Sequence, residues 1–196
     1  MGVSAAIVAS SVGAVSLFLA LLAVLANLVV LSALALMIAG RFSTGAAELR
    51  TGLLELIGPS SLWLAWAVAL VATLGSLYFS EVARFIPCKL CWYQRICMYP
   101  LVVLLGIAAW KGRAEVARAT LPLVAVGAVI STYHYLLERF PSWDTVASCD
   151  PAAPCTVVWV WRLHYLSIPG MALSAFLLIA VLILASRDAS PDQRTE

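Results

Sequence analysis

The sequence predicts an all-α integral membrane protein, a four-helix transmembrane bundle with an additional amino-terminal transmembrane helix. Of its 196 residues, 63% are hydrophobic and only 11% are charged. Apolar stretches of bilayer-crossing length recur along the chain, and the mean hydropathy of +1.00 is too high for an ordinary soluble domain. The net charge is only +2, and no basic cluster is interleaved with aromatic residues, so nucleic acid is set aside as a partner.

The chain begins with a long uncharged run. Val3 to Ala39 contains no charged residue, and a continuous helix over this run would be roughly 55 Å long. That length exceeds one bilayer crossing but falls short of two crossings with a turn between them. We therefore expect one long or tilted span, Ala14 to Ala39.

A segment of mixed composition, Gly40 to Ser61, follows the first span. Leu49 and Leu53 fall on one side of a helix drawn through it, and Glu48 falls on another. This pattern is typical of a short amphipathic helix at the membrane surface, and a plain linker is the alternative. Residues 1–61 are thus expected to form an amino-terminal transmembrane helix plus an amphipathic linker.

Four further apolar stretches follow, each about long enough for one crossing. They are Leu62 to Val82, Trp92 to Trp110, Ala119 to Leu137 and Pro169 to Ser186. We expect them to form a four-helix bundle over residues 62–186. A polar cytoplasmic tail is expected over residues 187–196.

The basic residues predict which loops face the cytoplasm. Seven lysines and arginines fall on one side of the predicted topology and five on the other. The loop from Lys111 to Arg118 is short and densely basic, and such loops weigh most in the positive-inside rule. We therefore place it in the cytoplasm, and the alternation of the spans then puts the loops around Cys88 and Cys149 together outside.

A Cys-x-x-Cys pair, Cys88 and Cys91, lies at the predicted outer membrane surface. Two sulfurs at this spacing can cycle between a dithiol and a disulfide. We expect Cys91 to begin a helix, where the exposed N–H groups and the nearby Lys89 would favour its thiolate. Cys97, the odd cysteine, is expected to be a small buried apolar residue.

The second pair, Cys149 and Cys155, lies in the longest predicted exterior loop, Glu138 to Ser167. A disulfide that only pins this loop is one alternative, and a zinc site formed by all four cysteines is another. The spacing of the second pair suits structural zinc poorly, so no metal is expected. Two exposed pairs on one face instead favour an electron relay by thiol–disulfide exchange, one pair facing a soluble partner and the other a component of the membrane.

These residues resemble those of a known family. Cys88-Lys-Leu-Cys91-Trp-Tyr-Gln-Arg95, followed two spans later by Cys149 and Cys155, is similar to the bacterial disulfide bond formation protein B family, and within it to the BdbC-type members. The resemblance covers roughly residues 62–186. The first span and the amphipathic segment lie outside the family's four-helix pattern, and the loop cysteines are closer together than in its best-known members.

The resemblance implies a quinone-dependent oxidoreductase, with ubiquinone or menaquinone as the acceptor. It would reoxidise a thioredoxin-fold thiol oxidase of the DsbA or BdbD type at the exterior side of the bacterial cytoplasmic (inner) membrane. The resemblance further implies that Cys149 is attacked by the partner's thiolate. Cys155 would then pass the electrons on through a transient bond with Cys88, which leaves Cys91 as a thiolate beside the quinone.

Two more residues are expected to bind the quinone by resemblance, Arg95 and His134. Arg95 would hold the quinone or stabilise the thiolate, and its alternative is to extend towards the lipid head groups. The alternative for His134 is a local hydrogen bond at the membrane interface. Two other functions stay open for the whole chain: a carrier of reductant towards exterior proteins, and a non-catalytic membrane scaffold with structural disulfides.

Overall fold

The computed structural model describes residues 2–143, 149 and 153–186, with the backbone alone for residues 2–9. Within these residues the regular structure is helical, and the only strand-like feature is an antiparallel bridge between Arg162 and Leu166. Five helices in the described part of the chain are long and apolar enough to cross a membrane. The predicted fold class, an all-α membrane protein, is confirmed.

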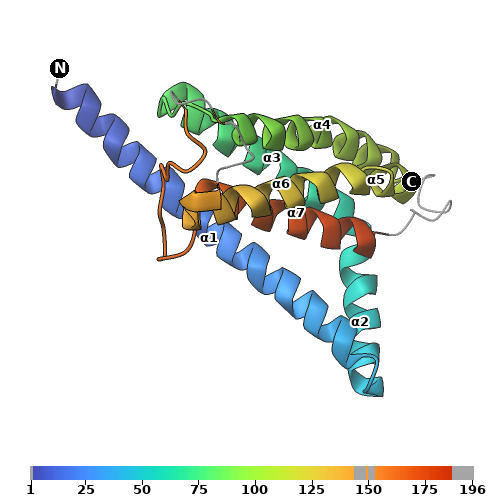
Figure 1. Ribbon diagram of the computed structural model, residues 1–196. Helices are drawn as coiled ribbons and strands as arrows, with labels where there is room; N and C mark the ends of the chain where they lie inside the picture. The colour runs from blue at the N-terminus through green and yellow to red at the C-terminus, as the bar shows by residue number, and fades with distance from the viewer. Residues whose placement is uncertain (1, 144–148, 150–152, 187–196) are drawn as a thin grey trace.

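The first helix, α1 (Gly2–Ala39), is continuous and begins well before the expected start at Ala14. It crosses the rest of the molecule diagonally, and its amino-terminal end projects beyond the other helices (Figure 1). The predicted short helix in the next segment is confirmed as α2 (Thr44–Ile57), none of whose residues is buried. A 3₁₀ turn, Gly58–Ser60, joins it directly to the following helix.

The remaining helices form the bundle. They are α3 (Ser61–Leu77) with a π-helical turn (Tyr78–Val82), α4 (Lys89–Lys111), the short α5 (Ala114–Arg118), α6 (Leu121–Arg139) and α7 (Ile168–Ala185). The long helices coincide with the four predicted spans to within a few residues at each end. The predicted tail, residues 187–196, lies outside the described residues.

Tightly packed apolar side chains from all four long helices fill the bundle. Leu101 and Leu105 of α4 meet Val124 of α6 and Phe176 of α7 in one buried cluster. Gly127 of α6 lies against the Phe176 ring, where a Cβ atom would collide with ring carbons. Glycine at this position therefore lets α6 and α7 approach closely enough to close the core.

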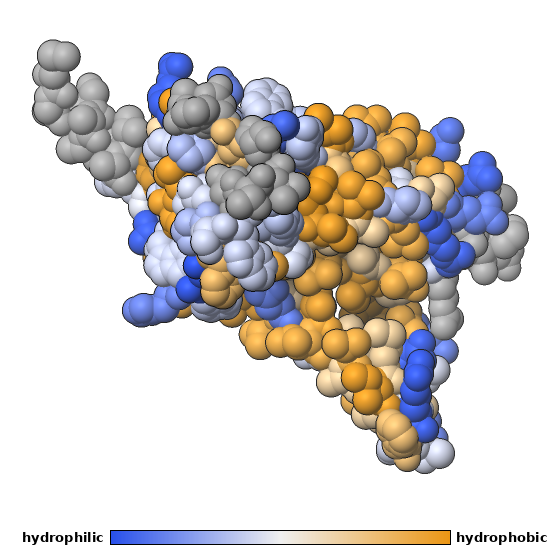
Figure 2. Space-filling view, viewed as in Figure 1, coloured by the Kyte–Doolittle hydropathy of each residue, from blue (hydrophilic) through white to orange (hydrophobic). Residues whose placement is uncertain are grey.

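The outer surface matches a membrane environment. Figure 2 shows hydrophobic surface over the middle of the helices and hydrophilic surface gathered towards both ends. Large apolar side chains point outward from several helices, including Leu28 of α1, Val103 of α4 and Val129 of α6. An apolar belt between polar ends is what lipid contact requires, so the chain is a multi-pass membrane protein.

Candidate active site

The first cysteine pair lies at the amino-terminal end of α4. Cys88 is the N-cap residue, with an extended backbone (φ −73°, ψ 172°), and the helix begins at Lys89. The backbone N–H of Cys91 donates to Cys88 Sγ at 3.3 Å. The predicted helix start at Cys91 is therefore wrong, and the sulfur that satisfies an open helix N–H belongs to Cys88.

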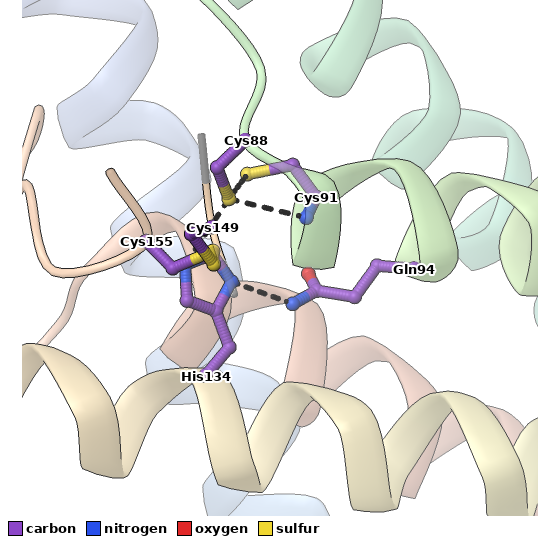
Figure 3. Close-up of a disulfide and its surroundings, with 6 residues drawn as sticks. All are labelled: Cys88, Cys91, Gln94, His134, Cys149 and Cys155. Carbon is purple, nitrogen blue, oxygen red and sulfur yellow. Dashed lines mark hydrogen bonds between the residues drawn. A yellow bond between two sulfur atoms is a disulfide. The ribbon is translucent and has the colours of Figure 1, made fainter. Parts of the chain in front are cut away.

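The two thiols are held together and against a histidine. Cys88 and Cys91 are free, with their Sγ atoms 2.9 Å apart. His134 of α6 is buried and places Nε2 3.5 Å from Cys88 Sγ, while Gln94 Nε2 donates to His134 Nδ1 at 2.9 Å (Figure 3). Because Nδ1 accepts, a neutral imidazole carries its proton on Nε2, where it faces the sulfur.

These contacts favour a thiolate on Cys88. The hydrogen bond from the Cys91 thiol has the largest effect in holding the pKa of Cys88 well below its ordinary value. Burial acts in the opposite direction, while His134 and the Cys91 backbone N–H lower the pKa further. In the reduced pair, Cys88 is thus the sulfur that ionises more readily.

The second pair forms a disulfide beside the first. Cys149 and Cys155 are bonded to each other, with their Cα atoms 5.9 Å apart. Cys155 is 0% exposed and packs in one buried cluster with Cys88 and Leu137, whereas Cys149 is half-buried (Figure 3). The structure therefore brings all four predicted cysteines together, with Cys155 as the inner sulfur of the loop pair.

Arg95 lies one turn deeper along α4 and is fixed by a neighbouring helix. Its Nε donates to Ser76 Oγ and its Nη2 to the Ser76 carbonyl oxygen, each at 3.0 Å. Its guanidinium carbon lies 5.2 Å from the centre of the Trp92 ring. With only 9% of its surface exposed, Arg95 is held inside the protein and does not extend towards lipid head groups.

An apolar cavity of ≈ 520 Å³ adjoins these residues, between α1, α3, α4 and α7. Its few polar lining side chains include Ser76, Cys91, Gln94 and Arg95. This volume lies in the range of small-molecule sites, and an apolar wall with a few convergent polar groups is typical of them. His134 is not among the described residues that line the cavity, and it contacts Cys88 instead.

Tyr99 lines the same cavity one turn further along α4 than Arg95. Its Oη is buried and has no hydrogen-bond partner among the described residues. A buried hydroxyl without a partner costs free energy, because it has lost its hydrogen bonds to water. An unsatisfied donor therefore lies within the wall of the cavity, enclosed by protein atoms.

An aromatic stack covers the part of the cavity near the thiols. Phe79, from the π-helical turn, stacks on Phe85 with ring centres 5.8 Å apart, and Phe85 stacks on Trp159 at 4.9 Å. All three residues line the cavity. Trp159 follows Cys155 in the loop between α6 and α7, so this loop both carries the disulfide and helps to close the cavity.

A metal-ligating group also occurs at the thiols. Each of three residues offers one possible ligand atom, and these atoms lie within 4.8 Å of one another: Cys88, Cys91 and His134. Structural zinc sites are closed by four ligands, and here Cys149 and Cys155 are used in a disulfide. The described residues therefore fit redox use better than the four-cysteine zinc alternative.

Three residues of the site escape sequence reasoning. Gln94 orients His134, Ser76 holds Arg95, and Tyr99 places a buried hydroxyl without a described partner in the wall of the cavity. Gln94 and Tyr99 follow Cys91 and Arg95 at helical spacing, which places them near the same side of α4. Ser76 lies on another helix, and no spacing in the sequence connects it with Arg95.

Comparison with known proteins agrees with this geometry. Residues 59–186 match the model of the family described as disulfide bond formation protein DsbB. Disulfide bond formation protein C of Bacillus subtilis is 48% identical over 120 residues, which are 61% of this chain and 87% of that protein. A probable disulfide formation protein C 1 of Bacillus cereus is 44% identical over 121 residues, covering 62% and 87%. No solved structure matches significantly.

Relatives of lower identity occur as well. A probable disulfide formation protein of Coxiella burnetii is 39% identical over 125 residues, which are 63% of this chain and 85% of that protein. The family match begins at residue 59, so it includes α3, α4, α6 and α7 but not α1 or α2. The four cysteines, Arg95 and His134 all lie within it.

Proposed function

This chain belongs to the disulfide bond formation protein DsbB family and is a membrane thiol oxidoreductase of disulfide formation, and from that premise we propose that it passes electrons from a partner dithiol to a membrane quinone. The partner would be a thioredoxin-fold thiol oxidase of the DsbA or BdbD type. It would meet the chain at the exterior side of the bacterial cytoplasmic membrane. The observation that carries the proposal is a dithiol packed between a disulfide and an apolar cavity.

The exposure of the sulfurs supports an order for the relay. Cys149 is the more accessible sulfur of the loop pair, and Cys155 is fully buried beside Cys88. Cys91 lines the cavity, whereas Cys88 does not. The accessible sulfur thus suits the partner, the two buried sulfurs suit transfer between the pairs, and Cys91 suits delivery to the acceptor.

The proposed relay starts with both cysteine pairs, Cys149–Cys155 and Cys88–Cys91, in the disulfide form. The partner's thiolate attacks Cys149 and releases Cys155, and the partner's second thiolate then displaces Cys149, so the partner leaves as a disulfide. The Cys155 thiolate next attacks Cys88 and releases Cys91. The Cys149 thiolate then attacks Cys155, which restores the loop disulfide and releases Cys88. Two electrons now reside in the Cys88 and Cys91 dithiol.

The release of Cys88 in the last exchange is favoured by its surroundings. A sulfur with a lowered pKa is a better leaving group, and the pKa of Cys88 is held low by the hydrogen bond from Cys91 and then by His134, against the effect of burial. His134 is thus proposed to act on the thiol and not on the quinone. Gln94 would keep its Nε2 proton directed at Cys88.

The residues around the cavity fit a quinone. When bound, a quinone supplies an oxidant that takes up two electrons and two protons. Arg95 would stabilise negative charge on an oxygen of the acceptor more strongly in this poorly hydrated cavity than in water. Tyr99 Oη would donate a second hydrogen bond, and Cys91 would contribute the sulfur nearest to the acceptor.

Two alternatives use the same cysteines differently. A carrier of reductant would move electrons from the membrane towards exterior proteins, and a scaffold would keep its disulfides unchanged. A scaffold would not need an apolar cavity that reaches one sulfur of a free dithiol, whereas the carrier differs from the proposed function in the direction of electron flow. A quinone is a stronger oxidant than an ordinary protein disulfide, so electron flow from a dithiol towards the membrane is the downhill direction.

The proposal is tested with the purified full chain under anaerobic conditions. A reduced thioredoxin-fold thiol oxidase is mixed with catalytic amounts of the chain, and its thiols are counted before and after quinone is added. We expect thiol loss only with quinone, one quinone reduced per disulfide formed. Cys91→Ala should abolish it, while Cys97→Ala, a matched change in a buried cysteine of the same helix, should not. No acceleration by quinone would exclude the proposed function.

A further inference from the structure

One wall of the cavity comes from α1, a helix outside the region that the family match covers. Leu19, Leu22 and Val29 of α1 line the cavity, together with side chains of the bundle such as Val68 of α3 and Ala175 of α7. The helix that is added to the four-helix pattern is therefore part of the space beside Cys91. An added anchor would not need to face this space.

Polar contacts hold the amino-terminal half of α1 in place. Arg162 donates from Nε to Ser16 Oγ at 2.9 Å and from Nη2 to the Gly13 carbonyl oxygen at 3.1 Å. Tyr78 donates from its hydroxyl to Ser11 Oγ at 2.9 Å. Arg162 belongs to the loop that carries the Cys149–Cys155 disulfide, so α1 is attached directly to the redox-active part of the molecule.

Close packing positions the same half of α1. A Cβ atom added to Gly75 of α3 would lie 2.8 Å from Leu19 Cδ1, which shows how closely the two helices approach. Ala20 and Ala23 of α1 are buried against Leu166. Small residues at these contacts are typical of helix association in membranes. The place of α1 beside the bundle is thus set by shape as well as by hydrogen bonds.

The cavity is long and has its charged group near one end. Its lining on α3 and the π-helical turn extends from Leu64 to Ser80, and the part from Leu64 to Ser76 alone spans roughly 18 Å at the rise of a helix. Arg95 and Cys91 lie at the end near Ser76, and the remaining walls are mostly apolar. Along α1, the lining residue Leu25 is 58% exposed, so the groove opens sideways towards the membrane.

We propose that α1 forms the second wall of a groove that binds the isoprenoid chain of a membrane quinone, with the head group at Cys91 and Arg95. This inference rests on the proposed function and extends it to the amino-terminal helix. An amphiphile with one redox-active polar end and a long apolar chain matches a groove that is polar near the thiols and apolar elsewhere. A phospholipid acyl chain and a second copy of the protein are the competing occupants.

Two neighbouring leucines of α1 provide a matched test. Leu22 lines the groove, whereas Leu21 is exposed and does not line it. Leu22→Trp fills the groove, and Leu21→Trp adds the same side chain on another face. The purified full-length variants are titrated in lipid nanodiscs with a long-chain prenyl quinone and with a quinone that lacks the chain, and bound quinone is quantified directly.

We expect Leu22→Trp to weaken binding of the long-chain quinone by about fivefold or more, as overpacking an apolar site typically does. Binding of the quinone without the chain should change by less than about twofold, and Leu21→Trp should leave both within that limit. If Leu22→Trp fails to fold, Val29→Trp and Leu28→Trp form a second pair, because only Val29 lines the groove.

The inference is overturned if Leu22→Trp leaves long-chain binding unchanged, or if it weakens both quinones equally. Loss of co-purified phospholipid, or a change in oligomeric state, with unchanged quinone binding would identify a competing occupant and also overturn it. If wild-type protein oxidises partner thiols with quinone but Leu22→Trp binds the long-chain quinone as wild type does, this inference alone fails. Wild-type protein that neither binds nor reduces quinone would remove the proposed function.

Discussion

The Sγ of Cys88 lies 3.5 Å from Nε2 of His134, two residues brought together from the start of α4 and the carboxyl-terminal half of α6. Gln94 fixes the ring from its other side, so the imidazole proton faces the sulfur. A hydrogen bond to a sulfur stabilises its charged form and lowers its pKa. This contact links a histidine of the bundle to the reactivity of the thiols and not to the cavity.

Removal of this imidazole should make Cys88 harder to ionise. The hydrogen bond from the Cys91 thiol and then His134 hold the pKa of Cys88 below its ordinary value, so reduced Cys88 becomes protonated at a lower pH than an ordinary thiol. His134→Ala should raise this pKa towards the ordinary thiol range, so less thiolate is present at a given acidic pH. The measurement is the ultraviolet absorbance of the thiolate against pH in the reduced protein.

The control for this titration is Thr132→Ala, because Thr132 is an exposed residue of the same helix whose hydroxyl donates to the Ala128 carbonyl oxygen. Gln94→Ala should give an intermediate curve, because the imidazole stays but loses its orienting partner. Superimposable curves for wild type and His134→Ala would show that the contact has no effect on the thiol.

The second prediction concerns the sulfur that meets the partner. Cys149 is the accessible sulfur and Cys155 is fully buried, so a partner that lacks its second cysteine should be trapped through Cys149. Cys155→Ala should accumulate this mixed disulfide, which non-reducing electrophoresis and mass spectrometry would identify. Equal trapping through Cys155 in the Cys149→Ala protein would reverse the assignment.

Much of the fold is predictable because the length of an apolar stretch depends only on consecutive residues of the sequence. Among the described residues, the five candidate membrane helices follow from long apolar stretches with few charges, and the clustering of the two cysteine pairs agrees with the shared side expected from counting crossings. The start of α4 was misplaced because Cys88 acts as the N-cap, a position where serine, threonine, aspartate and asparagine are the usual signals.

The site itself was only partly predictable, because its polar partners come from different helices. The sequence indicates Arg95 and His134, but not that Ser76 binds the first or that Cys88 and Gln94 bind the second. The contribution of α1 to the cavity also depends on packing at Gly75, which hydropathy cannot reveal. Spacing along one helix predicts neighbours on that helix, whereas contacts between helices require the folded structure.

The third prediction separates binding from stability at Tyr99. Its buried Oη has no partner among the described residues, so Tyr99→Phe should leave the ligand-free protein at least as stable as wild type. If the hydroxyl donates to quinone, the same change should raise the apparent KM for quinone by about three- to tenfold. Thermal unfolding and quinone titration together measure both effects.

Tyr93→Phe is the control for Tyr99→Phe, since Tyr93 lies on the same helix, is exposed and does not line the cavity. It should change neither quantity. A Tyr99→Phe protein with lower stability and an unchanged KM would show that the hydroxyl has a structural partner and takes no part in quinone binding.

The last prediction assigns Arg95 to the acceptor end of the relay. Two hydrogen bonds to Ser76 hold its guanidinium at the wall of the cavity, one turn deeper than Cys91. Arg95→Ala should raise the apparent KM for quinone about tenfold or more and lower kcat, because a hydrogen bond from a charged donor is lost. Arg95→Lys should recover only part of this, since an ammonium lacks the planar donors. Ser76→Ala should have a smaller effect, because the carbonyl oxygen still accepts from Nη2.

The control is Arg118→Ala, which removes an arginine bound to a backbone carbonyl at the other end of the bundle. The first exchange with the partner, followed in a single turnover, should stay near normal in all four variants. A slowed first exchange with unchanged quinone kinetics in Arg95→Ala would move its role to the thiols and require the quinone site to be sought elsewhere in the bundle.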